Sequence, residues 1–404
     1  MKLEHLKPLI KRGEKTKIVM LVLDGLGGLP FDDTKLETAL EAAEIPNLDA
    51  LAARSVCGLH QPVGTGITPG SGPGHLGLFG YDPLTYQVGR GVLSALGIDF
   101  DLQPGDVAAR GNFCTVDDEG VVTDRRAGRI PTEQGQTLCN LLQKQVSLGG
   151  AEVFIQPVKE YRFLLVLRGD GLEGDITETD PLEVGEAPLE AEALAPDSEK
   201  AARLVRSFVE QVRNILSDRD PANLVLLRGF SQLPDWPKMD EAFGLRGVAI
   251  AMYPMYRGVA KLVGMDALPA SKTVAEEIDK LEAHWDAYDF HFVHVKRIDS
   301  AGEDGDFDRR VSLIEEADAL IPRILDLKPD VLVVTGDHST PAKMRYHSWH
   351  PVPALLWSPI CRPDNVTQFG ERACLTGGLG ARFPAHELMP LMLANAQRLD
   401  KFGA

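Results

Sequence analysis

The stretch Val331-Leu-Val-Val-Thr-Gly-Asp337-His338-Ser339 decides the fold of this chain. Its continuous apolar run is typical of a strand that is buried on both faces, as in a parallel sheet covered by helices. The run ends in an adjacent carboxylate and imidazole, two side chains that commonly bind divalent metal ions. We therefore expect a buried parallel strand whose carboxyl end holds part of a metal site.

Several other segments repeat this pattern of buried strands separated by helices. Continuous apolar runs occupy residues 17–23, 223–227, 248–252 and 290–295. Helical patterns occupy residues 45–55, 198–216, 273–287 and 310–327. This alternation predicts an α/β fold built on a doubly wound, mainly parallel sheet.

The pattern changes between about residues 99 and 190. Shorter strand-like stretches at 107–116, 121–124, 153–157 and 162–168 surround one helical stretch at 132–146. This arrangement indicates a smaller α+β domain, so we expect a core formed by residues 1–98 and 191–404 around an inserted substrate-binding domain at 99–190. The acidic segment 171–195, rich in Pro and Gly, is expected to be a surface loop or the return linker.

The charge balance limits the classes of partner. The chain has 42 Lys and Arg against 59 Asp and Glu, a formal charge of −17, which disfavours nonspecific binding to nucleic acid or anionic membranes. Its five cysteines are widely spaced and form no Cys-x-x-Cys pair, so they predict neither a disulfide framework nor a thiolate zinc site. No apolar run reaches the ~20 residues that span a bilayer. We expect a cytoplasmic protein; the composition is also compatible with an oligomer.

Candidate metal ligands occur at the ends of several predicted strands. Asp24 follows the strand at 17–23, at the edge where open α/β sheets collect their ligands. A single Asp in such a place is more often a turn or N-cap residue, so the argument depends on co-occurrence. The candidate ligands are Asp24, Asp299, Glu303, Asp337, His338 and His347. Together they predict a centre for two divalent ions, best suited to Mn²⁺, with Mg²⁺, Co²⁺ or Zn²⁺ as alternatives.

A glycine-rich turn at residues 64–80 presents Ser71 near the start of a predicted helix. Backbone amides at such a helix start favour an anion. The spacing matches neither a Walker loop nor the Gly-x-Ser-x-Gly nucleophile elbow. A flexible loop with a helix cap explains the turn equally well. Beside two metal ions, the Ser71 hydroxyl would be a nucleophile toward a phosphoryl group.

Basic residues are concentrated within the predicted insertion of an otherwise acidic chain. The cluster consists of Arg110, Arg125, Arg126 and Arg129, together with the polar Asn112. Guanidinium groups match phosphate and carboxylate oxygens in pairs, so the cluster suits a small phosphorylated acid as substrate. The alternative is surface ion pairing, the commoner fate of an isolated Arg. Arg162 and Arg257 are weaker candidates for substrate binding.

Longer motifs carry a family resemblance. They are Asp24-Gly, Pro-Gly-Ser71-Gly, Gly-Arg90-Gly, Arg-Gly-Asn112-Phe, Asp124-Arg-Arg-Ala-Gly-Arg-Ile, Val-Thr-Gly-Asp337-His338-Ser-Thr-Pro and His347-Ser-x-x-Pro-Val-Pro. From about residue 19 to residue 394, the chain resembles the archaeal-type 2,3-bisphosphoglycerate-independent phosphoglycerate mutases of the alkaline phosphatase superfamily.

The resemblance implies interconversion of 3-phosphoglycerate and 2-phosphoglycerate through a phosphoserine at Ser71, without 2,3-bisphosphoglycerate. It implies one metal ion at Asp24, Ser71, Asp337 and His338, and another at Asp299, position 303 and His347. It also suggests Asp124 as the base that moves the glycerate proton.

Position 303 departs from the family pattern, which has His where this chain has Glu303. The carboxylate adds negative charge beside an incoming phosphate and shifts the metal preference toward Mn²⁺ or Mg²⁺. Two other functions stay open: another phosphotransferase or phosphomonoesterase of the same superfamily, and a metal-binding regulatory protein that has lost catalysis. The Arg-rich insertion favours a mutase, because a hydrolase needs no domain to retain the dephosphorylated alcohol.

Overall fold

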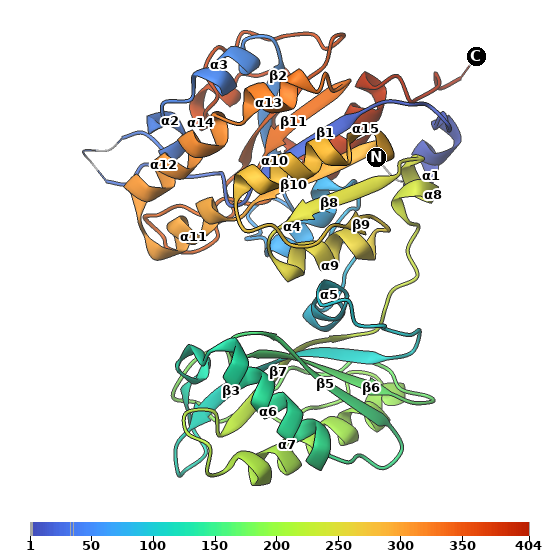
Figure 1. Cartoon of the computed structure of the whole chain (residues 1–404), viewed down its shortest axis with the longest axis vertical. Coiled ribbons are helices and arrows are strands. Elements are labelled where there is room, and N and C mark those ends of the chain that lie inside the picture. Colours follow the sequence, from blue (N-terminus) through green and yellow to red (C-terminus); the bar gives the residue numbers. More distant parts are fainter. Residues whose placement is uncertain (1–2, 33, 35, 404) are drawn as a thin grey trace. The chain divides into compact units, whose positions relative to one another are not determined.

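The computed structural model describes residues 3–32, 34 and 36–403, which form two compact units (Figure 1). One unit, here called the core unit, combines the chain up to Gln87 with the chain from Trp236 onward. The other, the inserted unit, is the continuous segment Val88–Asp235. Its boundaries differ from the expected 99 and 190.

Among the described residues, the core unit contains an eight-stranded sheet with the order β13-β2-β12-β11-β1-β10-β8-β9. The strands are β1 Ile18–Leu23, β2 Val56–Gln61, β8 Gly247–Ala251, β9 Asp266–Ala267, β10 Phe290–Val295, β11 Val331–Thr335, β12 Val352–Trp357 and β13 Gly380–Pro384. Strands β11, β1, β10 and β8 run parallel, whereas β12 is antiparallel to both of its neighbours. The expected α/β fold with a mainly parallel sheet is confirmed.

Helices occupy the segments before, between and after the strands of this sheet. They are α1 Leu3–Leu6, α2 Ala39–Ala42, α3 Pro46–Ala52, α4 Ser71–Leu78, α8 Met239–Phe243, α9 Pro254–Leu262, α10 Val274–Ala283, α11 Arg297–Asp304, α12 Phe307–Asp318, α13 Ile321–Asp326, α14 Glu371–Cys374 and α15 Leu388–Asn395, with 3-10 turns η1 Lys7–Leu9, η4 Trp285–Ala287 and η5 Ala385–Glu387. The single helix expected at 310–327 is two helices, α12 and α13. Pro322 sits in the first turn of α13, where proline starts a helix but cannot continue one.

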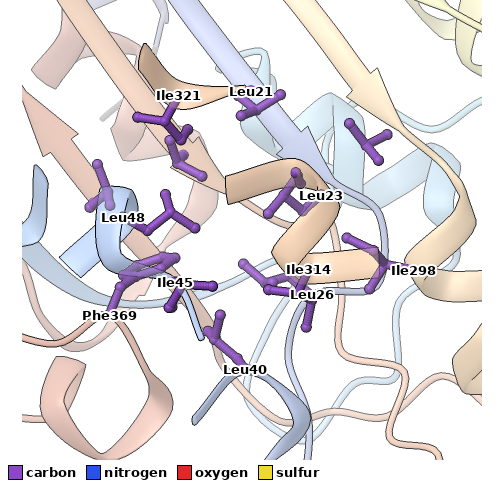
Figure 2. Close-up of a cluster of buried hydrophobic side chains, with 14 of the residues drawn as sticks. Leu21, Leu23, Leu26, Leu40, Ile45, Leu48, Ile298, Ile314, Ile321 and Phe369 are labelled. Carbon is purple, nitrogen blue, oxygen red and sulfur yellow. The ribbon is translucent and has the colours of Figure 1, made fainter. Parts of the chain in front are cut away.

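One face of the central strand β1 packs against helices from distant parts of the chain. Leu21 and Leu23 alternate along β1 and so point to the same face, where they join a fully buried cluster. Figure 2 shows this cluster, in which Ile298 comes from α11, Ile314 from α12, Ile321 from α13 and Leu48 from α3. This packing fixes the carboxyl end of β1, and with it the residue that follows, Asp24.

The inserted unit has its own five-stranded sheet. Its strands are β3 Val107–Val116, β4 Val122–Asp124, β5 Glu152–Lys159, β6 Arg162–Arg168 and β7 Leu224–Ser231. Its helices are α5 Arg90–Gly97, α6 Thr132–Gln145 and α7 Glu199–Leu216, with 3-10 turns η2 Ala127–Arg129 and η3 Pro196–Ser198. Strand β3 is central and pairs antiparallel with β4, β6 and β7.

The assignment of residues 223–227 to the parallel core sheet was wrong, because β7 pairs antiparallel with β3 in the inserted unit. Both faces of β7 are nevertheless covered. Val225 and Leu227 join the unit's main core, and Leu224 and Leu226 join a small second cluster. The resulting continuous apolar run does not reveal which sheet the strand joins. Since α7 and β7 belong to the inserted unit, that unit extends well past residue 190.

Among the described residues, no helix combines the length and the apolar character that crossing a membrane requires.

Candidate metal centre

Two neighbouring strands of the core sheet deliver three candidate ligands to one place. Asp24 directly follows β1, while Asp337 and His338 follow the parallel neighbour β11. The Nε2 atom of His338 lies 3.5 Å from Asp24 Oδ1 and 3.2 Å from Asp337 Oδ2. All three side chains are fully buried. We call Asp24, Asp337 and His338 the first ligand group.

A second ligand group consists of Asp299, His347 and the shared His338. Asp299 lies in the first turn of α11, which follows β10. The distance from His347 Nε2 to Asp299 Oδ1 is 3.6 Å, and the His338 and His347 rings stack with centroids 3.7 Å apart. Because His338 belongs to both groups, the two groups form one continuous centre.

Ser71 reaches this centre from the first position of α4. Its Oγ atom lies 3.2 Å from His338 Nε2. The close approach of α4 to the end of β11 requires a glycine at position 74, since a Cβ there would lie only 2.4 Å from the backbone oxygen of Asp337. The glycine-rich turn thus positions the hydroxyl next to the ligands.

Hydrogen bonds determine which nitrogen of each imidazole faces the centre. His347 Nδ1 lies 2.9 Å from the carbonyl oxygen of Pro69, which only accepts hydrogen bonds, so this nitrogen carries the proton. Thr340 Oγ1 donates to Asp299 Oδ1 at 2.7 Å and must therefore accept from His338 Nδ1 at 3.0 Å. With the Nδ1 hydrogen bonded in this way, the neutral form of each ring presents an unprotonated Nε2 to the centre, as metal ligation requires.

The buried carboxylates of the first ligand group are incompletely satisfied. Both oxygens of Asp24 and Oδ2 of Asp337 have no hydrogen-bond partner among the described residues. Leaving buried carboxylate oxygens unsatisfied is costly. Burial would raise the pKa of Asp24, but the Lys296 ammonium and the neighbouring His294 outweigh it and hold that pKa well below its usual range. These features fit divalent cations as the missing partners.

Glu303 stands at the margin of the centre. It lies one helical turn after Asp299 in α11, with Oε1 4.0 Å from His347 Nε2. Its side chain is 54% exposed, and it belongs to neither ligand group. Partial burial and the charge of Asp299 raise its pKa. Of the expected ligands, the structure therefore brings all but Glu303 into direct proximity.

Four further residues of the centre were not anticipated. The Nζ atom of Lys296 lies 3.4 Å from Asp24 Oδ2, and Thr340 bridges the two groups as described. His294 Nε2 lies 3.1 Å from Asp24 Oδ2, and His75 Nδ1 lies 3.3 Å from Asp337 Oδ2. Sequence signals existed for two of them, since Lys296 is three residues before Asp299 and Thr340 is two residues after His338.

In the inserted unit, three expected substrate-binding residues share one face of the sheet. Asn112 on β3 is directly opposite Arg162 on β6, and Arg110 is opposite Arg228 on β7. Directly opposed residues of antiparallel strands lie on the same face. The other face carries the alternate residues, such as Phe163, which join the core with α6 and α7. Arg228 was not anticipated from the sequence.

The other expected basic residues have different surroundings. Arg125 forms a two-point ion pair with Asp180, at 2.8 and 2.7 Å. Arg126 and Arg129 are exposed in the turn that contains η2. The carboxylate of Asp124 organises this turn by accepting the N–H groups of Arg126 at 2.8 Å and Gly128 at 2.6 Å.

Arg257 lies on α9 of the core unit, and partial burial lowers its pKa.

Comparisons with known proteins agree on one family. A family model described as 2,3-bisphosphoglycerate-independent phosphoglycerate mutase matches residues 52–223. The chain is 50% identical to a protein of Aquifex aeolicus named as a probable mutase of this kind, over 399 residues that cover 96% of this chain and 97% of that protein. A Thermus thermophilus protein of the same name is 50% identical over 404 residues, covering 98% and 99% of the two chains.

Solved structures of similar proteins share the fold. The PH0037 protein from Pyrococcus horikoshii is 30% identical, with a TM-score of 0.83 over 96% of this chain and 100% of that chain. A structure described as cofactor-independent phosphoglycerate mutase from Thermoplasma acidophilum is 28% identical, with a TM-score of 0.68 over 94% of this chain and 100% of that chain.

Proposed function

We propose a phosphoserine mechanism for this chain, which belongs to the family of 2,3-bisphosphoglycerate-independent phosphoglycerate mutases, a family of isomerases. The reaction is the interconversion of 3-phosphoglycerate and 2-phosphoglycerate. The observation that supports the mechanism is the 3.2 Å distance between Ser71 Oγ and Nε2 of the shared His338, because a hydroxyl so close to both ligand groups is suited to act as the nucleophile.

Two phosphoryl transfers complete the reaction. First, Ser71 Oγ bonds to the phosphorus of 3-phosphoglycerate while the bond from phosphorus to the C3 oxygen breaks. The seryl proton departs, and the released glycerate oxygen takes up a proton. Then the C2 hydroxyl oxygen of the retained glycerate loses its proton and bonds to the phosphorus, the bond to Oγ breaks, and Ser71 regains a proton. Backbone amides at the start of α4 favour the anionic phosphoryl group.

The residues of the centre fit two divalent ions. We assign one ion to the first ligand group with Ser71, and the other to Asp299 and His347 with support from Glu303. Mixed carboxylate and imidazole ligation suits Mn²⁺, with Mg²⁺, Co²⁺ or Zn²⁺ as alternatives. When bound, such ions lower the pKa of a coordinated hydroxyl and neutralise phosphoryl charge. Both oxygens of Asp24 and the Oδ2 atom of Asp337 accept no hydrogen bond from the described residues, which supports this assignment.

The inserted unit is proposed to hold the glycerate between the two transfers. Arg110, Asn112 and Arg162 share one sheet face, and guanidinium groups match carboxylate and phosphate oxygens. Arg125, Arg126 and Arg129 extend this set around the turn that Asp124 organises. Asp124 is our candidate base for the glycerate proton, because each of its oxygens keeps a lone pair beyond its amide hydrogen bond.

Replacing the nucleophile tests the mechanism. With Mn²⁺ and 3-phosphoglycerate, we expect Ser71→Ala to abolish formation of 2-phosphoglycerate while changing Mn²⁺ affinity by no more than about tenfold, since the hydroxyl acts mainly as nucleophile. Intact-mass measurement after substrate exposure should show a phosphoryl adduct on the wild type and none on the variant. Ser312→Ala, on the outer part of α12, is the matched control and should behave like the wild type.

Two outcomes contradict the mechanism. If Ser71→Ala turned over substrate at the wild-type rate, Ser71 would not be the nucleophile. Release of free phosphate without 2-phosphoglycerate would show a phosphatase instead of a mutase.

A further inference from the structure

Lys296 lies where the two ligand groups meet. It directly follows β10 and precedes α11. Its Nζ atom is 3.4 Å from Asp24 Oδ2 in the first ligand group, and it makes a still shorter ion pair with Asp299 Oδ2 in the second. A single ammonium thus contacts one carboxylate from each group.

When no divalent ion is bound, the buried carboxylates of the two ligand groups need another counter-charge. Asp24, Asp299 and Asp337 are at most 1% exposed, and buried carboxylates that lack a counter-charge are strongly disfavoured. Lys296 is itself only 23% exposed. Among the described residues, Lys296 is the lysine whose ammonium lies within ion-pair distance of both ligand groups.

The ammonium and a divalent ion compete for the same oxygens. A metal ion at normal ligand distance from Asp24 Oδ2 or Asp299 Oδ2 would lie within a few ångströms of the present Nζ position, where two positive charges repel. Lysine has a flexible stem with a compact charge, so it can swing aside. The face of Tyr256, whose centroid is 5.7 Å from Nζ, offers a cation–π partner near the centre.

We propose that Lys296 is the protein's own cation for this centre, bound by Asp24 and Asp299 without metal and displaced from both when divalent ions enter. The proposal rests on the proposed function, because it takes these carboxylates as metal ligands. The ammonium keeps the ligands assembled in the metal-free protein and weakens metal binding in return.

Metal binding by Lys296→Met tests this exchange. The variant removes the ammonium from both carboxylates, so it should bind Mn²⁺ about tenfold more tightly than the wild type, while its metal-free form melts several degrees lower. Full-length protein is stripped with a chelator. Mn²⁺ is then titrated by calorimetry and by competition with a chromophoric chelator, and thermal unfolding is followed with and without Mn²⁺.

Arg297→Met is the matched control. It removes one positive charge at the neighbouring position, where the side chain is 53% exposed and 3.9 Å from Glu316. Its Mn²⁺ affinity should stay within about twofold of the wild type, because exposed charges are screened. If Arg297→Met bound Mn²⁺ as tightly as Lys296→Met does, the loss of one positive charge would explain the effect at either position. That result would overturn the proposal.

The remaining outcomes are separable. Unchanged or weaker Mn²⁺ binding by Lys296→Met overturns the exchange while leaving the metal centre intact. Absence of Mn²⁺ binding by the wild type instead removes the metal centre, and the exchange with it. If Lys296→Met does not fold without metal, its melting temperature is measured over a Mn²⁺ series. If the melting temperature of Lys296→Met rises more steeply with Mn²⁺ concentration than that of the wild type, the exchange is supported. If the two melting temperatures rise in parallel, the exchange is refuted.

Discussion

The hydroxyl of Thr340 touches both ligand groups. It donates to Asp299 Oδ1 at 2.7 Å and lies 3.0 Å from His338 Nδ1. The side chain is fully buried, so water does not replace either contact. Thr340 thereby sets the tautomer of the shared histidine and orients a carboxylate of the second group, a role typical of residues behind metal ligands.

Thr340→Val removes this hydroxyl while keeping the side-chain shape. We expect Mn²⁺ affinity to fall by about 10- to 100-fold, since residues that orient metal ligands have effects of this size. Thr340→Ser restores the hydroxyl and should bind Mn²⁺ within about threefold of the wild type. Calorimetric titration of the metal-stripped proteins measures both. A loss of Mn²⁺ affinity in Thr340→Ser as large as that in Thr340→Val would show that restoring the hydroxyl does not restore binding, and would contradict the hydrogen-bonding role.

The proximity of most candidate ligands was predictable from the sequence, whereas the residues that contact them were not. Asp24, Asp337 and His338 follow buried parallel strands, and such strands end at one edge of a sheet. Lys296 and Thr340 act through side-chain contacts that depend on the path of the loops, which residue types and periodicity do not encode. Glu303 was predicted as a ligand from its spacing after Asp299, but at that position its side chain is about half exposed to solvent.

At the scale of single elements, strands covered on both faces were located well. The expected stretch at 107–116 coincides with β3, and the deciding stretch contains β11. The pattern of apolar residues indicates that a strand is buried, but it does not indicate which strand it pairs with. For this reason β7 was assigned to the wrong sheet. Strands β2 and β12 were not anticipated. Gly58 and His60 interrupt the apolar run of β2, and Pro353 interrupts that of β12.

Helix α10 carries a buried acid that the proposed reaction does not use. Glu277 is fully buried, and neither of its carboxyl oxygens has a hydrogen-bond partner among the described residues. Burial raises its pKa to about 9, against the opposing effect of Lys280. An unfolded glutamate titrates near ~4.3. Between these two values the folded state therefore holds a proton that the unfolded state has lost.

The sign of the pH effect follows directly from this difference. Where the folded state binds more protons, stability falls as pH rises, so Glu277 destabilises the protein progressively from about pH 4.3 to pH 9. We expect Glu277→Gln to be more stable than the wild type by about 1–3 kcal/mol at pH 8. The two proteins should converge near pH 5.

Thermal unfolding of both proteins across this pH range measures the difference. Glu210→Gln, an exposed position on α7, is the control and should track the wild type at every pH. A difference between Glu277→Gln and the wild type that does not grow with pH would contradict a protonated Glu277.

On the scale of the whole molecule, the inserted unit contains everything that a separate domain needs. All partners of its central strand β3 lie within Val88–Asp235. Helices α6 and α7 contribute Leu142 and Phe208 to a core formed entirely from this segment. Its length is in the usual range for domains that fold alone.

We therefore expect the fragment 88–235 to unfold in one cooperative thermal transition, followed by circular dichroism. The fragment 99–190 is the informative comparison, because it ends before α7 and β7 and so loses one neighbour of β3 together with one of the two covering helices. It should show no cooperative transition, since the apolar residues that faced α7 and β7 become exposed to water. Cooperative unfolding of the shorter fragment, or its absence in the longer one, would mean that contacts outside 88–235 hold this unit together.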